Sequence, residues 1–312
     1  MFLSHTSNRS IAVLAVLVLF GTGCRAIRSK RMTKDLMNAR TCSLRGADYL
    51  QKKNYSQAGP LFDEALKYSD ADERAHWGLA EVLWQEEKPQ EAIDHMSQAV
   101  GLSGENPELL VRLGEMFLEV NDLDQALAQA NMALSHDRKH APAWELKGRV
   151  LKQQDQLRDA LDCYSRSMIF RPDHAPARIA MADIYRQLGR PQMALVTLDE
   201  LAEDQPTEPL PARVWMLKGQ ALAALGEISE SRACLAQATR CVGEDETDIL
   251  VALAHIHLSS GELAQAKMSL GRALQCEPNH MGARSLQAQL DRSLADISRT
   301  NIAAQPARWK QN

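Results

Sequence analysis

Residues 141–172 read APAWELKGRVLKQQDQLRDALDCYSRSMIFRP, and this stretch shows how the chain is built. Apolar residues recur at three- and four-residue spacing in each half, which predicts two amphipathic helices joined by a short turn. Gly148, Ala160 and Ser167 stand where a buried helix face usually carries a large side chain. We expect these small residues at the crossing of two antiparallel helices, where a large side chain would cost about 1–3 kcal/mol by overpacking.

The same pattern recurs about every 34 residues between Ala39 and His280. The Gly148 position is repeated as Gly46, Ala80, Gly114, Ala182, Gly219 and Ala254, and the Ala160 position as Ala58, Ala92, Ala126, Ala194, Ser231 and Ala266. A fixed period of this length predicts stacked supersecondary units, each of which buries its apolar face only against its neighbours. The predicted units are 39–72, 73–106, 107–140, 141–174, 175–208, 212–245 and 247–280.

The repeated residues resemble the tetratricopeptide repeat, most clearly at Trp144, Gly148, Ala160, Tyr164 and Pro172 of the fourth unit. The resemblance covers seven units. It implies an all-α fold, a right-handed superhelical solenoid of about seven helix-turn-helix units. Residues 281–297 have helical spacing and are expected to cap the last unit, and residues 298–312 are expected to form a flexible tail.

Charge is unevenly distributed along the 312 residues. Residues 25–40 carry six Lys or Arg and one Asp, whereas residues 41–312 carry 29 Lys or Arg and 39 Asp or Glu. Nucleic-acid binding rests on neutralising phosphates, so an acidic body argues against a nucleic-acid partner. The sequence contains no Gly-rich phosphate loop and no Cys pairs at zinc spacing. We therefore predict no catalytic residues, no cofactor, no metal site and no small-molecule substrate.

The first residues, MFLSHTSNRSIAVLAVLVLFGTGC, have the pattern of an export signal. The apolar run from Ile11 to Phe20 is about half the length that spans a bilayer as a helix, which is typical of a cleaved signal peptide. The end resembles the lipobox of bacterial lipoproteins, with Gly23 before Cys24, although Gly21 stands where Leu is usual. This resemblance implies that 1–23 is removed, that Cys24 is lipidated and that 24–38 is a basic linker.

Three locations follow from different interpretations of this segment. A lipidated Cys24 places the body in the cell envelope, anchored to a membrane and facing the periplasm or the cell exterior. Ordinary signal cleavage would release a free protein. The basic residues that follow the apolar run would instead favour a signal anchor with a cytoplasmic body under the positive-inside rule.

The remaining cysteines are an odd number: Cys42, Cys163, Cys234, Cys241 and Cys276. Cys241 and Cys276 share a position with Tyr68, Leu102 and Phe170 of other units, and we expect this position to be buried and apolar. Adjacent helices pack about 8–10 Å apart, beyond the reach of a disulfide. We predict free, buried thiols. His257 takes a large-residue position and is expected in the core, and it faces away from His255, so the two do not form a metal site.

The family resemblance implies that the first helix of each unit lines a concave inner surface on which ligands bind. Trp77 and Trp84 are seven residues apart, so they share a helix face. They serve either as anchors for a peptide or amphipathic helix, or as packing against the first unit. Charges that pass from acidic to basic along the groove suit a partner with apolar anchors and mixed charge. The predicted groove residues are Trp77, Glu81, Trp84, Val111, Glu115, Leu118, Arg149, Lys152 and Arg186.

The sequence thus predicts a non-enzymatic scaffold that binds a peptide or helix of a partner protein, and that assists assembly of an envelope complex. The alternative is a substrate-recognition or regulatory subunit of a separate envelope enzyme, such as a glycosyltransferase or a peptidoglycan enzyme.

Overall fold

The computed structural model describes residues 32–204, 210–243 and 246–303. The predicted export signal, Cys24 and residues 304–312 lie outside the described residues. Every regular element in the described ranges is a helix, which confirms the predicted all-α class. No helix within those ranges has both the length and the apolar character needed to cross a bilayer. The chain divides into two compact units, residues up to Gln154 and residues from Asp155 on.

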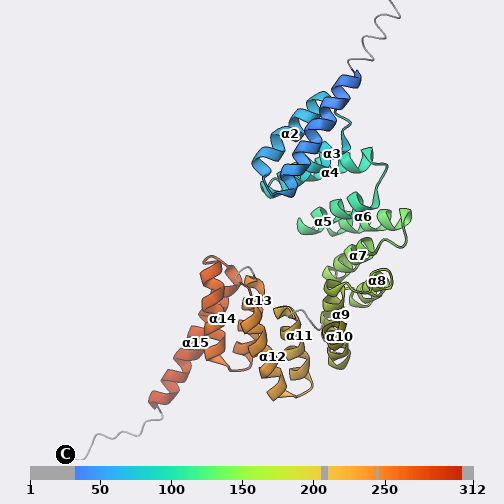
Figure 1. The fold of residues 1–312 in the computed structure, drawn as a ribbon. Helices are drawn as coiled ribbons and strands as arrows, with labels where there is room; N and C mark the ends of the chain where they lie inside the picture. Colours follow the sequence, from blue (N-terminus) through green and yellow to red (C-terminus); the bar gives the residue numbers. More distant parts are fainter. Residues whose placement is uncertain (1–31, 205–209, 244–245, 304–312) are drawn as a thin grey trace, which may run out of the picture. The chain divides into compact units, whose positions relative to one another are not determined.

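The first compact unit begins with a helix over residues 32–51, so seven residues of the expected linker are helical. Six helices follow: α2 (Tyr55–Tyr68), α3 (Glu73–Gln85), α4 (Pro89–Leu102), α5 (Pro107–Glu119), α6 (Leu123–His136) and α7 (Ala141–Gln153). Helices α3 and α4 pair as a hairpin, as do α5 and α6, and α5 also contacts α7 in the next repeat (Figure 1). The first helices of these two repeats therefore lie side by side, as the groove hypothesis requires.

The second compact unit repeats this arrangement. Its helices are α8 (Leu157–Phe170), α9 (Ala175–Gln187), α10 (Pro191–Asp204), α11 (Ala212–Ala224), α12 (Ile228–Cys241), α13 (Thr247–Ser259), α14 (Leu263–Cys276) and α15 (Met281–Ala303). Helix α15 packs on α14 and α13 and buries Ala283 and Leu290 completely, so it covers the last hairpin (Figure 1). It continues to Ala303, six residues beyond the expected end of the cap.

Small residues do allow close approach, both of the paired helices and of the next repeat. A Cβ added to Gly114 in α5 would lie 2.5 Å from Leu146 Cδ2 and 3.3 Å from the carbonyl oxygen of Ala126 in α6. A Cβ on Gly219 would meet the Leu235 side chain at 2.8 Å. Contacts below 3 Å cannot be accommodated without movement of a neighbour, so the prediction from the repeated small residues is confirmed.

The prediction of a buried position for Cys241 and Cys276 is wrong, because both side chains are exposed. The three residues at the equivalent place, Tyr68, Leu102 and Phe170, are also exposed. Each is the last residue of the second helix of its repeat, where the side chain faces solvent instead of the neighbouring hairpin.

The other thiols and the core histidine were placed more accurately from the sequence. Cys42 and Cys163 are buried, Cys234 is half-buried, and no disulfide forms among the described cysteines. His257 is buried as predicted, and its Nδ1 lies 2.8 Å from a carboxylate oxygen of Glu262.

Candidate partner-binding groove

The inner helices of the first compact unit carry eight of the nine predicted groove residues. Trp77, Glu81 and Trp84 lie on α3, Val111, Glu115 and Leu118 on α5, and Arg149 and Lys152 on α7. The ninth, Arg186, lies on α9 in the second compact unit, where it donates a 2.8 Å hydrogen bond to the buried carboxylate of Asp183.

The two tryptophans on α3 have different surroundings. Trp77 is 37% exposed and offers its indole as surface. Trp84 is half-buried and packs against two core clusters of the first compact unit. The guanidinium carbon of Arg112 lies 6.0 Å from the Trp84 ring centroid, within cation–π range. The packing interpretation therefore describes Trp84, whereas Trp77 retains the exposure that an anchor needs.

Val111 and Leu118 contribute little surface to the groove, contrary to the prediction. They are only 7% and 8% exposed, and both belong to the core cluster that also contains Ala80 and Leu146. An apolar side chain on this face of α5 is covered by the neighbouring inner helices, and a partner could not reach it without opening the stack.

The charged groove residues are paired with one another along the stack. Arg112 donates from Nε to Glu81 Oε1 at 2.7 Å and from a terminal nitrogen to Oε2 at 2.8 Å. It also lies 3.6 Å from Glu115, which in turn accepts a 3.0 Å hydrogen bond from Arg149. We call these four residues the charge ladder. The hydrogen bond to Glu81 raises the pKa of Arg112 despite its partial burial.

The sequence predicted charges that change from acidic at one end of the groove to basic at its centre, and the structure shows the charge ladder instead. Acids and bases alternate across α3, α5 and α7, and their charges are largely neutralised within the chain. Arg112 was missed by the sequence analysis because it falls outside the predicted inner positions. Its 31-residue separation from Glu81, close to one repeat, was the available signal.

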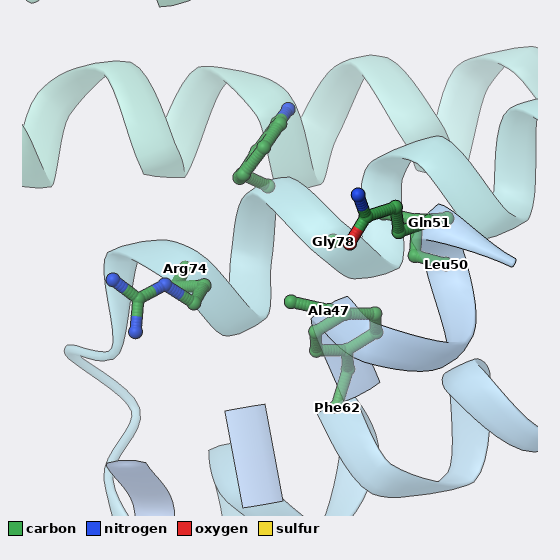
Figure 2. Close-up of a pocket in the computed structure, with 7 residues that line it drawn as sticks. Ala47, Leu50, Gln51, Phe62, Arg74 and Gly78 are labelled. Carbon is green, nitrogen blue, oxygen red and sulfur yellow. The ribbon is translucent and has the colours of Figure 1, made fainter. Parts of the chain in front are cut away.

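The groove also contains an apolar pocket of about 330 Å³ that the sequence analysis did not predict. Phe62 forms part of its wall, and the other lining residues are Ala47, Leu50, Gln51, Arg74, Trp77 and Gly78 (Figure 2). The pocket thus lies between the helix over residues 32–51 and α3, next to the exposed Trp77. Ala47 and Leu50 stand 34 residues before Glu81 and Trp84, so extending the repeat alignment to the first unit would have identified them.

A hydrogen bond joins two histidines, His76 of α3 and His95 of α4. His76 Nε2 lies 3.0 Å from the carbonyl oxygen of Asp70, and its Nδ1 lies 2.9 Å from Nδ1 of His95. A carbonyl only accepts, so His76 carries its proton on Nε2 and accepts at Nδ1 from His95. Burial, and then the neighbouring His76, lower the pKa of His95. In the described part of the chain, no three metal-binding side chains cluster closely enough to hold an ion.

Comparison with known families now identifies the architecture. Three models described as tetratricopeptide repeats match the chain at residues 44–107, at 83–150 and 151–220, and at 212–240 and 247–280. The chain is a tetratricopeptide repeat protein. The matches span most of the seven repeats that the 34-residue period predicted, and they confirm that resemblance.

Curated relatives match this tetratricopeptide repeat protein only over part of their length. DnaJ homolog subfamily C member 3 of Gallus gallus is 26% identical over 110 residues, 35% of this chain and 22% of the relative. General transcription factor 3C polypeptide 3 of Homo sapiens is 30% identical over 111 residues, 32% of this chain and 12% of the relative. The chain thus spans less than a quarter of either protein.

Solved structures show the same fold over most of this repeat protein. A tetratricopeptide repeat protein from Parabacteroides merdae superposes with a TM-score of 0.69 at 15% identity, covering 81% of this chain and 99% of the other. Pseudomonas aeruginosa pilF gives 0.56 at 17% identity, with 82% and 99% coverage. PilW, titled a type IV pilus biogenesis factor, gives 0.58 at 22% identity, with 64% and 91% coverage.

Proposed function

We propose that this tetratricopeptide repeat protein is a non-enzymatic scaffold that binds a peptide or helix of a partner protein on its inner helices. The observation that carries the proposal is the exposed Trp77 on α3, which stands beside an apolar pocket and one helical turn from Glu81 of the charge ladder. Exposed aromatic side chains next to a concave apolar surface are frequent anchors of protein–protein binding. The family match supports the same class of function.

We further propose that the scaffold acts at the cell envelope, held there by a lipid on Cys24. The export signal and the lipobox resemblance support this location, and the fold similarity to pilF and PilW is compatible with a role in assembling an envelope complex. Mass spectrometry of the mature amino terminus tests the anchor directly. A diacylated Cys24 is expected, whereas an intact Met1 or cleavage without a lipid would contradict it.

The groove itself is tested by capturing partners from detergent-solubilised membranes on the purified full chain. Trp77→Ala removes an exposed side chain, so we expect binding of the captured partner to fall about tenfold while the circular dichroism spectrum is unchanged. Phe170→Ala is the matched control, because this aromatic residue is similarly exposed but lies at the end of α8, outside the inner helices.

Partner binding that survives Trp77→Ala would place the binding surface elsewhere. Recovery of one stoichiometric catalytic chain would instead favour the alternative, a substrate-recognition or regulatory subunit of a separate envelope enzyme.

A further inference from the structure

We propose that the pocket between the helix over residues 32–51 and α3 binds one large apolar side chain of an acidic peptide, and that Arg74 pairs with an Asp or Glu side chain beside that anchor. This inference rests on the proposed scaffold function and specifies the chemistry of the partner. The pocket supplies the apolar contact, and Arg74, its charged lining residue, selects the charge.

The pocket has a rigid aromatic wall. Phe62 is fully buried, and its ring lies against the backbone of two glycines. A Cβ added to Gly46 would come within 2.7 Å of the ring, and one added to Gly78 within 2.1 Å. Because the ring is held from both sides, the pocket exists before a ligand binds, and little ordering is needed on association.

The size and lining of the pocket suit a single anchor. A volume of about 330 Å³ is at the lower end of the range for ligand pockets. Ala47 and Leu50 are half-buried, and the exposed Trp77 extends the apolar surface at the rim. Figure 2 shows Arg74 on one side of the pocket and Gln51 on the other, and the Gln51 amide can both donate to and accept from a peptide backbone.

Charge complementarity decides in favour of an acidic partner. Arg74 is exposed in the first turn of α3 and forms no ion pair with any residue that the structure describes, unlike Arg112 and Arg149 in the charge ladder. The adjacent Asp72 carboxylate is already engaged, since it accepts the backbone N–H of Ala75 at 3.0 Å.

The helix beside the pocket and the turn after it add a small positive charge. Residues 32–51 carry three Lys or Arg and two Asp, and Lys52 and Lys53 follow in the turn, although residues 41–312 as a whole are acidic. Basic peptides would be repelled from this end of the groove. A peptide with an acidic residue next to its apolar anchor gains from both the positive charge and the pocket.

A selection from a display library of random peptides against the immobilised full chain tests the proposal. We expect the enriched sequences to combine a large apolar residue with an adjacent Asp or Glu. Arg74→Glu should change the selected neighbour to Lys or Arg. Arg158→Glu is the matched control, because Arg158 is likewise the second residue of its helix, is exposed, and lies on α8. The control should select the original motif.

Binding of the selected peptides then separates the two contacts. Ala47→Phe fills the pocket from a half-buried position, and we expect at least a tenfold loss of affinity, measured by fluorescence anisotropy. Arg74→Gln should weaken binding about two- to fivefold, as expected for an exposed ion pair. Circular dichroism establishes that each variant is folded.

Failure of this inference is distinguishable from failure of the scaffold function. The inference is overturned if no peptide is enriched, if the motif lacks an acid, if Arg74→Glu selects the same motif, or if binding survives Ala47→Phe. If a captured protein partner is lost with Trp77→Ala yet kept by Ala47→Phe and Arg74→Glu, the scaffold function stands and only the proposed ligand chemistry falls. If no partner is captured at all, the scaffold function itself fails.

Discussion

Replacing Gly78 by Ala should destabilise the first compact unit, even though Ala is the better helix former. Gly78 lies inside α3, and an added Cβ would be 2.1 Å from Cζ of Phe62. The Phe62 ring is fully buried, and a Cβ on Gly46 would meet it as well, so the only free space beside the ring is the apolar pocket that it lines. The methyl group must therefore displace the ring or push α3 away from α2.

The size of the effect follows from two opposing terms. Forcing a methyl group into a packed core costs about 1–3 kcal/mol, and exchanging Gly for Ala in a helix gains up to about 1 kcal/mol. Gly101 in α4 supplies the control, because a Cβ added there meets nothing within 4 Å. Gly101→Ala should raise the free energy of unfolding slightly. The helix-propensity gain largely cancels between the two variants, which leaves a difference of about 1–3 kcal/mol for overpacking.

Urea unfolding followed by circular dichroism measures this difference, and hydrogen exchange of α2 and α3 peptides localises it. Repeat proteins need not unfold in one step, so the local exchange rates are the decisive readout. Adding Phe62→Leu to Gly78→Ala should recover part of the loss by shortening the obstructing side chain. If Gly78→Ala and Gly101→Ala shift stability equally in the same direction, the close packing of Phe62 against α3 is refuted.

Three further predictions concern the charged, titratable and thiol side chains. Arg112→Met should lower the free energy of unfolding in urea by about 1–3 kcal/mol, because Glu81 then loses its partner and lies near the carboxylates of Glu115 and Glu119. An unchanged free energy of unfolding would mean that the charge ladder does not contribute to stability. The pKa of His95 is lowered in the folded state, so its contribution to stability is present above the unfolded value of 6.5 and is lost as pH falls towards the folded value. His95→Asn should flatten that part of the pH–stability curve, and an unchanged slope would contradict the lowered pKa of His95. Maleimide labelling of the native chain, located by peptide mapping, should modify the exposed Cys241 well before the two buried thiols, and equal rates would contradict the fold near α12.

The 34-residue period placed the candidate groove residues on the first helices of the repeats, but it could not give their burial or their partners. The period put Trp77 and Glu81 on one inner helix. It could not show that Val111 is covered by neighbouring helices, because burial depends on how closely adjacent repeats approach. The alignment could have placed Ala47 and Leu50 on the first inner helix, but the sequence could not show that they and α3 leave a pocket between them.

The sequence alone determined the repeat and the helices, because the spacing of apolar residues selects a helix face and the small residues at fixed positions permit close crossing. Gly114 and Gly219 play the roles that their positions predicted. Only the tertiary structure decided that Arg112 neutralises Glu81 and that Phe62 is locked between Gly46 and Gly78. Contacts of this kind depend on the offset and angle between neighbouring hairpins, which the repeat period does not specify.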